Sequence, residues 1–153
     1  MDGSNIKMIN KSTTLNRKEK MALAKLLVSN KLRDRASIEF EIEKGHIIYL
    51  RIYWMDIKDK MQMICFFPYL EKLIIRNCKI GSLPAEFALL TNLSSLTISF
   101  FNMRKFYEIE NLFPTLFFLP KLKELVLEYV VFDSDTSNNN IKNFQKNFIK
   151  IFL

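Results

Sequence analysis

The sequence is poor in the residues that build loops, disulfides and metal sites: it has three glycines, four prolines, two cysteines and one histidine. So little glycine and proline excludes collagen-like chains and chains dominated by linkers. Two cysteines cannot make a disulfide scaffold, which favours a reducing, intracellular environment. No apolar run approaches the roughly 20 residues of a membrane-spanning helix. The polar residues 1–14 also lack the apolar stretch of a secretory signal. We therefore expect a soluble, cytoplasmic protein.

What the chain does have is apolar content and an uneven charge. Its 153 residues are 49% hydrophobic, which is too apolar for a disordered chain and enough for one domain with a real core. The net charge of +7 comes mainly from the two ends of the chain, while the middle is nearly balanced. Nucleic-acid-binding proteins more often gather their basic residues on one face or helix, so basic solvated ends are the favoured interpretation.

An internal repeat determines the predicted architecture. Four copies of one apolar spacing begin 23, 23 and 29 residues apart. Within each copy the fourth and sixth positions alternate with the fifth, so a short strand directs two side chains inward. One such unit cannot cover its own apolar face, but stacked units with parallel strands can. The copies are Ile47-x-x-Leu50-x-Ile52-x-x-Met55-x-Ile57, Leu70-x-x-Leu73-x-Ile75-x-x-Cys78-x-Ile80, Leu93-x-x-Leu96-x-Ile98-x-x-Phe101-x-Met103 and Leu122-x-x-Leu125-x-Leu127-x-x-Val130-x-Phe132.

Through these copies, residues 47–132 resemble the leucine-rich-repeat family. The second copy matches best, because Leu83-Pro84 and then Phe87, Leu90 and Leu93 resemble the family's continuation. The resemblance implies an α/β solenoid, a right-handed curved array with parallel strands on its concave face. The family usually has Asn or Cys at the ninth position, and here only Cys78 conforms. We expect apolar packing to replace the polar bridging between repeats.

The segments on either side of the repeats resemble caps. Residues 1–13 are expected to be flexible, and residues 14–46 to form an N-terminal helix and strand cap. A helix is expected within residues 14–30, with Asn16 and Glu19 spaced as a capping box. Ser37–Glu43 alternates apolar and acidic residues and is expected to pair antiparallel with residues 47–53 after a Lys44-Gly45 turn. This strand would cover the open edge of the stack.

The C-terminal segment, residues 133–153, is predicted to be a polar loop followed by an amphipathic cap helix. Lysines occupy the side of residues 141–153 opposite the apolar stripe. A helix that closes the last repeat is the first interpretation. A membrane-surface or partner-binding helix is the second. The stripe consists of Ile141, Phe144, Phe148, Ile149 and Phe152.

Residues that carry out chemistry are scarce. His46 follows Gly45 at an expected turn, and no second histidine exists for a two-histidine metal site. Cys65 and Cys78 lie in apolar segments and are interpreted as inert core thiols. No G-x-S-x-G motif supports a Ser-His-Asp arrangement, although a pair such as His46 and Asp56 could be tested by substitution. We therefore expect no enzyme activity, no cofactor and no metal.

Surface recognition is the remaining function, and the repeat indicates where it would occur. Repeat positions three, five, seven and eight direct side chains away from the core or follow the strand's end. Tyr, Trp and Arg are the residue types that dominate binding energies at interfaces. Trp54 and Phe100 have an alternative, in which they turn inward as core residues. The predicted partner-binding residues are Tyr49, Arg51, Tyr53, Trp54, Lys72, Ile74, Arg76, Thr97, Ser99, Phe100, Glu128 and Tyr129.

The resemblance implies a non-catalytic module that binds a protein or peptide partner through its concave strands. The alternative is a basic protein that binds RNA or an anionic membrane through Arg51, Arg76 and the Lys-rich ends, with binding that falls steeply as salt rises. A third interpretation is that the chain belongs to a longer array or associates with itself through its apolar tail.

Overall fold

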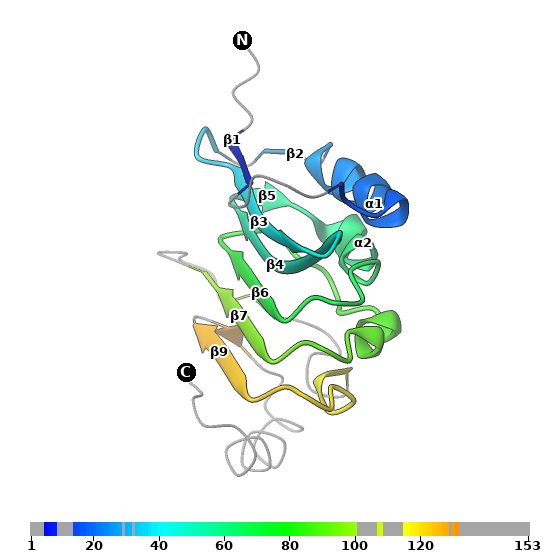
Figure 1. Cartoon of the computed structure of the whole chain (residues 1–153). Coiled ribbons are helices and arrows are strands. Elements are labelled where there is room, and N and C mark those ends of the chain that lie inside the picture. The colour runs from blue at the N-terminus through cyan, green and yellow to red at the C-terminus, as the bar shows by residue number, and fades with distance from the viewer. Residues whose placement is uncertain are drawn as a thin grey trace.

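The computed structural model describes residues 5–8, 14–28, 30–31, 33–100, 107–108, 115–128 and 130–131. They form a mixed α/β structure with a six-stranded, mostly parallel sheet and few helices (Figure 1). The helices are α1 (Arg17–Leu27), α2 (Met61–Ile64) and the 3-10 helices η1 (Lys58–Lys60) and η2 (Ala85–Leu89). The strands are β1 (Asn5–Met8), β2 (Asn30–Lys31), β3 (Ser37–Glu43), β4 (His46–Tyr53), β5 (Met55–Asp56), β6 (Lys72–Arg76), β7 (Ser95–Ser99), β8 (Tyr107–Glu108), β9 (Glu124–Glu128) and β10 (Val130–Val131).

The six-stranded sheet has the order β1-β3-β4-β6-β7-β9. The β3–β4 pair is antiparallel, and the other four neighbouring pairs are parallel. Two small sheets, β10-β8 and β2-β5, lie outside it. The helices gather along one face of the large sheet, which is at the right in Figure 1. The connections from β4 to β6 and from β6 to β7 therefore leave the sheet on the same side and return to the next strand.

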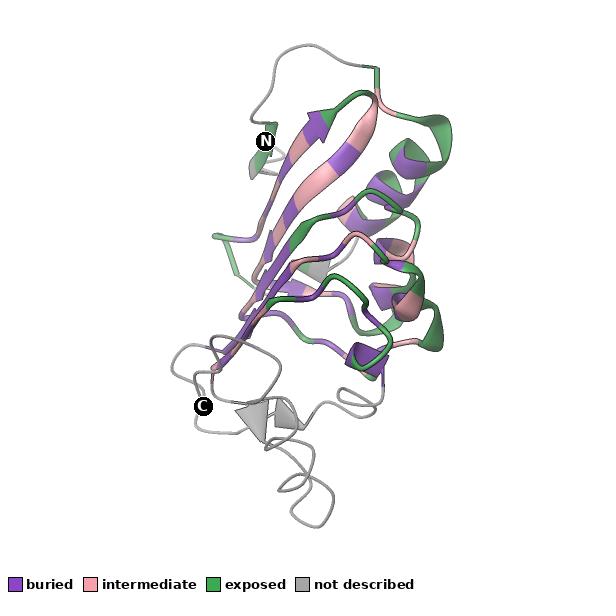
Figure 2. Cartoon of the chain, turned by 60° about the horizontal axis from the view of Figure 1, so that its bottom comes forward, coloured by how far each residue is buried: buried purple, intermediate pink, exposed green. Residues whose placement is uncertain are grey.

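The four repeat strands align in the register that the repeat predicts. Leu50 pairs with Leu73, Leu73 with Leu96, and Leu96 with Leu125. All four leucines are completely buried. The predicted parallel column of leucines is therefore confirmed, because a slip of one residue would have turned these side chains to the opposite face. Figure 2 shows buried residues along the strands of the large sheet and in the helices beside it.

Backbone hydrogen bonds join successive repeats at both ends of the strands. Before the strands, Glu71 N donates to Ile48 O at 2.8 Å and Ser94 N donates to Glu71 O at 2.8 Å. After the strands, Trp54 N donates to Arg76 O at 3.1 Å and Asn77 N donates to Ser99 O at 2.8 Å. These bonds satisfy backbone groups between neighbouring turns. They explain how the repeats stack although three of the four ninth positions lack a polar side chain.

The hairpin between β3 and β4 forms as expected. Its two-residue turn has positive φ at both positions, 50° at Lys44 and 83° at Gly45, which matches the right-handed twist of the flanking strands. Strand β3 covers the edge of the repeat stack, as expected. Asn5–Met8, within the segment expected to be flexible, forms the additional strand β1 and pairs parallel with β3. Strand β3 is thus an interior strand of the sheet.

Helix α1 is shorter than the expected segment, and its first turn differs from the expected capping box. The side chain of Asn16 accepts a hydrogen bond from Lys18 N at 2.9 Å, as an N-cap residue should. The Asn16 amide, which Glu19 was expected to bind, donates instead to Gly45 O at 2.8 Å. Glu19 is thereby free to contact the β4 strand. The expected C-terminal helix of residues 141–153 lies outside the described residues.

Among the described residues, no helix is long and apolar enough to cross a membrane.

Candidate functional site

One face of the six-stranded sheet has no described helix over it, and we call it the open face (Figure 1). The strand register places the side chains at repeat positions three, five and seven in three rows across it. The first row is Glu41, Tyr49, Lys72, Ser95 and Glu124; the second is Lys7, Glu39, Arg51, Ile74, Thr97 and Val126; the third is Ser37, Tyr53, Arg76, Ser99 and Glu128. The predicted residues of β4 and β6 are thus neighbours on one surface.

Arg51 lies near the centre of this surface and is held on two sides. Its Nη1 lies 3.4 Å from Glu39 Oε2 on β3, and its guanidinium lies 4.5 Å from the centre of the Tyr53 ring. Its Nε is buried and has no hydrogen-bond partner. A guanidinium stacked on an aromatic ring keeps its edge available for a planar anion. Arg51 is therefore oriented by Tyr53 while one of its donors stays unused.

Arg76 and Lys72 provide two further cations on β6. The Arg76 Nε is also buried without a hydrogen-bond partner. Within the described part of the chain, neither side chain forms an ion pair. Arg76 is half-buried and pairs in register with Tyr53, whereas Lys72 is exposed. The β4 and β6 strands therefore carry three cations, of which one has a carboxylate partner.

Tyr49 and Tyr53 are both half-buried on β4. Burial raises the pKa of the Tyr49 phenol, and the neighbouring Arg51 opposes this shift. The phenol therefore stays protonated at neutral pH and can donate a hydrogen bond. Each ring combines apolar area with a polar group, which is the property that makes tyrosine frequent at interfaces.

Trp54 follows β4 and is less available than the sequence suggested. It is half-buried, contacts the core, and has the Arg33 guanidinium 4.6 Å from the centre of its ring. Its φ is 52°, in the left-handed region that bulky residues rarely occupy. Asn77, at the same position of the next repeat, has a φ of 54°. The first two repeats therefore share this left-handed turn, and Trp54 is in part a core residue.

Four other predicted residues are buried and present little surface. Phe100 is completely buried in the core, which is the inward alternative considered for it. Ile74, Thr97 and Ser99 are each less than a tenth exposed. Short side chains expose little area when paired strands on both sides carry longer ones, as β6 does beside β7. These four residues do not belong to the accessible part of the open face, so their assignment is corrected.

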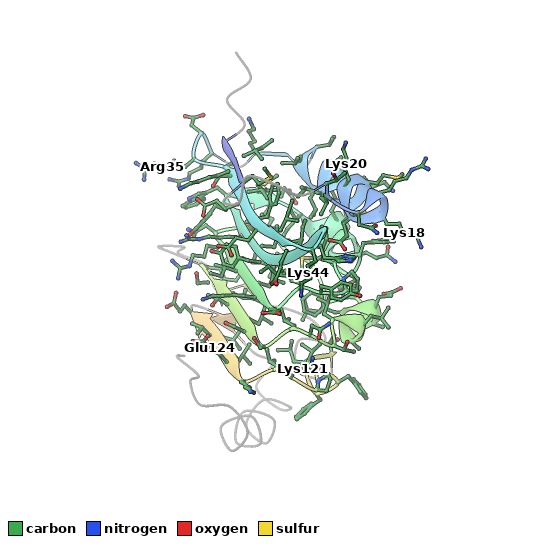
Figure 3. The ribbon with its side chains drawn as sticks, viewed as in Figure 1. Lys18, Lys20, Arg35, Lys44, Lys121 and Glu124 are labelled. Atoms are coloured by element: carbon green, nitrogen blue, oxygen red, sulfur yellow. The ribbon has the colours of Figure 1, made fainter. Side chains whose placement is uncertain are left out.

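The far end of the open face is acidic. Glu124 and Glu128 lie on β9, and Glu124 Oε2 accepts a hydrogen bond from Ser95 Oγ at 2.7 Å. Figure 3 shows Glu124 on β9, well away from Lys18 and Lys20 on α1. Glu39 and Glu41 on β3 make the opposite border acidic as well. The predicted residue Tyr129 lies outside the described residues.

A second cluster, which sequence reasoning missed, joins α1 to the start of β4. Glu19 is 2% exposed, and its Oε1 lies 2.6 Å from His46 Nδ1. Its Oε2 accepts a hydrogen bond from Ile47 N at 2.7 Å. An ionised carboxylate only accepts hydrogen bonds, so with Glu19 in that form the Nδ1 of His46 is the donor. Glu19 had been assigned to the capping box, and a buried partner on a strand has no local sequence signal.

His46 borders a shallow depression on the surface. The His46 ring lies 4.1 Å from the Tyr69 ring, centre to centre. The depression has a volume of about 430 Å³ and also contains Glu43, Glu71 and Asn92. Its lining is about half polar and half apolar, and the depression is open to solvent. The contacts of Glu19 with both His46 and the β4 backbone favour a structural role for this cluster, because they fasten α1 to the sheet.

The remaining chemical candidates are separated in space. Asp56, considered as a partner for His46, instead contacts Lys79 at 3.6 Å and accepts a hydrogen bond from Lys58 N at 3.3 Å. Burial raises the thiol pKa of both Cys65 and Cys78 to about 12. Such thiols stay protonated and react slowly. In the described ranges, no three His, Cys, Asp or Glu side chains come together as a metal site would require.

In comparisons with known proteins, no protein-family model, no curated protein and no solved structure matches this chain.

Proposed function

We propose that this chain is a short leucine-rich-repeat solenoid that binds a protein or peptide partner through the open face, without catalysis. The main support is the juxtaposition of Tyr49, Arg51 and Tyr53 on β4 with Lys72 and Arg76 on β6. These aromatic and cationic side chains are accessible and lie on rigid, paired strands. Residues held in this way lose little conformational entropy when a partner binds. The cytoplasmic location stays a prediction from the sequence.

The alternative function, RNA or anionic-membrane binding, has less support from the charge distribution. The cations of β4 and β6 lie between acidic residues on β3 and on β9. A long polyanion crossing the face would meet carboxylates on both sides. Like charges brought together at an interface oppose binding.

Selection of random phage-displayed peptides on the immobilised full chain would test the proposal. We expect wild-type protein to select peptides whose binding is lost with Tyr49→Ala/Tyr53→Ala. The matched control, Phe66→Ala/Phe118→Ala, removes two exposed rings outside the open face and should bind as wild type. Circular dichroism and melting would establish that both variants are folded.

The proposal fails if the selected peptides bind the tyrosine variant as well as wild type. Direct titration with RNA and with anionic vesicles, over a range of salt, tests the alternative. Tight binding there with steep salt dependence, and no peptide selected, would favour the alternative function.

A further inference from the structure

We infer that the open face recognises an acidic peptide segment, one of whose Asp or Glu side chains binds between Arg51 and Arg76. This inference rests on the proposed function, and it specifies the chemistry of the partner at that site.

The strand register brings the two arginines together. Arg51 pairs with Ile74, and Arg76 is two residues further along β6, beside Tyr53. Diagonal neighbours on paired strands lie about 7–8 Å apart, within reach of long side chains. Tyr53 contacts the first arginine and neighbours the second, because its ring lies under the Arg51 guanidinium and its backbone pairs with Arg76. Two guanidinium groups therefore border one small area of the surface.

Both arginines keep an unused donor in this area. The Nε atoms of Arg51 and Arg76 are buried and have no hydrogen-bond partner. Because these Nε atoms are buried, an approaching acceptor meets the partly exposed remainder of each arginine side chain instead. A carboxylate that meets a guanidinium group can accept two parallel hydrogen bonds from it. Two neighbouring guanidinium groups therefore suit an Asp or Glu side chain in charge and in hydrogen bonding.

The charges around the arginines select a partner with few, localised negative groups. Glu39 approaches Arg51 only at 3.4 Å, and Arg76 and Lys72 have no carboxylate partner in the described residues. Glu39 and Glu41 on β3 and Glu124 and Glu128 on β9 flank the cations of β4 and β6. A peptide with isolated carboxylates fits such a narrow area, whereas nucleic acid does not. Tyr49 and Tyr53 add apolar area that a peptide backbone and its side chains can cover.

The experiment uses synthetic, fluorescein-labelled versions of the peptides selected on the full chain. Binding is measured by fluorescence anisotropy against wild type, Arg51→Gln, Arg76→Gln and the control Arg17→Gln. Arg17 begins α1, is exposed and lies away from the open face. We expect Arg76→Gln and Arg51→Gln each to weaken binding about tenfold, the effect of losing one charged hydrogen-bonded pair. Arg17→Gln should leave binding unchanged.

A second arm tests the peptide side of the contact. Replacing the Asp and Glu of the peptide by Asn and Gln should weaken binding to wild type about tenfold, but should add little further loss with Arg76→Gln. A charge swap strengthens the test, because Arg76→Glu should regain binding with a Lys-substituted peptide. If Arg51→Gln proves unfolded by circular dichroism, Arg51→Lys retains the charge and loses the planar donor edge.

The outcomes separate this inference from the proposed function. Selected peptides that lack acidic residues, yet lose binding with Tyr49→Ala/Tyr53→Ala, would overturn the inference and leave the function intact. Peptides that are insensitive to the tyrosine substitutions would overturn both. If phosphoserine in place of Glu gave far tighter binding that required both arginines, the partner would be a phosphopeptide and our assignment wrong. Equal arginine dependence for RNA would overturn it as well.

Discussion

The buried carboxylate of Glu19 provides a sharp test of how the N-terminal cap is attached to the sheet. In Glu19→Ala, His46 Nδ1 and Ile47 N lose their common acceptor. Each hydrogen bond to a charged group contributes about 1.5–3 kcal/mol. Allowing for water that replaces part of the loss, we expect Glu19→Ala to lower the free energy of unfolding by about 3 kcal/mol.

Glu19→Gln keeps one oxygen acceptor of nearly the same shape. It should therefore lose about half as much stability as Glu19→Ala. The matched control is Glu86→Ala, since Glu86 is exposed and accepts one long hydrogen bond, 3.3 Å, from Gln62 Nε2. Glu86→Ala should change the free energy of unfolding by no more than about 0.5 kcal/mol.

Urea unfolding, followed by the fluorescence of the single tryptophan, Trp54, measures these differences. With a urea dependence of about 2 kcal/mol per molar, Glu19→Ala should lower the midpoint by about 1.5 M. The single variant His46→Ala and the double variant Glu19→Ala/His46→Ala complete a cycle that gives the coupling energy of the pair, expected near 1 kcal/mol. A loss in Glu19→Ala no larger than that in Glu86→Ala would refute the reasoning, because Glu19 would not then fasten α1 to the sheet.

Two further predictions concern the core. Leu96→Ala should lower the free energy of unfolding by about 3 kcal/mol in the same urea assay, because Leu96 is completely buried between Leu73 and Leu125. The control Leu89→Ala, at a leucine that is 64% exposed, should lower it by less than about 0.5 kcal/mol. Equal losses in the two variants would contradict the leucine column. The Cys78 thiol has a pKa of about 12 in the folded protein, against an ordinary value of 9.0. The unfolded chain therefore releases this proton first, and the free energy of unfolding falls as pH rises between these values, by at most about 1.4 kcal/mol per pH unit. Measured from pH 8 upward, this fall should be shallower in Cys78→Ala, and an unchanged fall would contradict the burial of the thiol.

The repeat strands could be predicted because their information is local and recurs. The alternation around Leu73 and Leu96 determines which side chains face inward, and the same spacing in each copy determines the register between copies. The hairpin was equally accessible, because Gly45 readily takes the positive φ of its turn and alternating residues flank it. The rows of the open face follow from the same register, so the adjacency of Tyr53 and Arg76 was predictable.

Other features depended on neighbours far away in the sequence. Strand β1 was missed because a four-residue edge strand carries too little pattern to distinguish it from a polar terminus. The burial of Thr97 and Ser99 depends on the size of side chains on adjacent strands, which a repeat position does not specify. Trp54 was ambiguous for the same reason, since Arg33 and the core together determine how much of its ring is covered.

By itself the amino-acid sequence determined the stack of parallel strands, their register and the residues that line each face. These depend on a two-residue alternation and on a spacing that recurs along the chain. Only the tertiary structure decided that Glu19 binds His46 and the β4 backbone, that Phe100 lies in the core, and that the arginines of β4 and β6 keep free Nε donors. Burial and hydrogen bonding of a side chain depend on every group that surrounds it in space, and those groups come from distant parts of the chain.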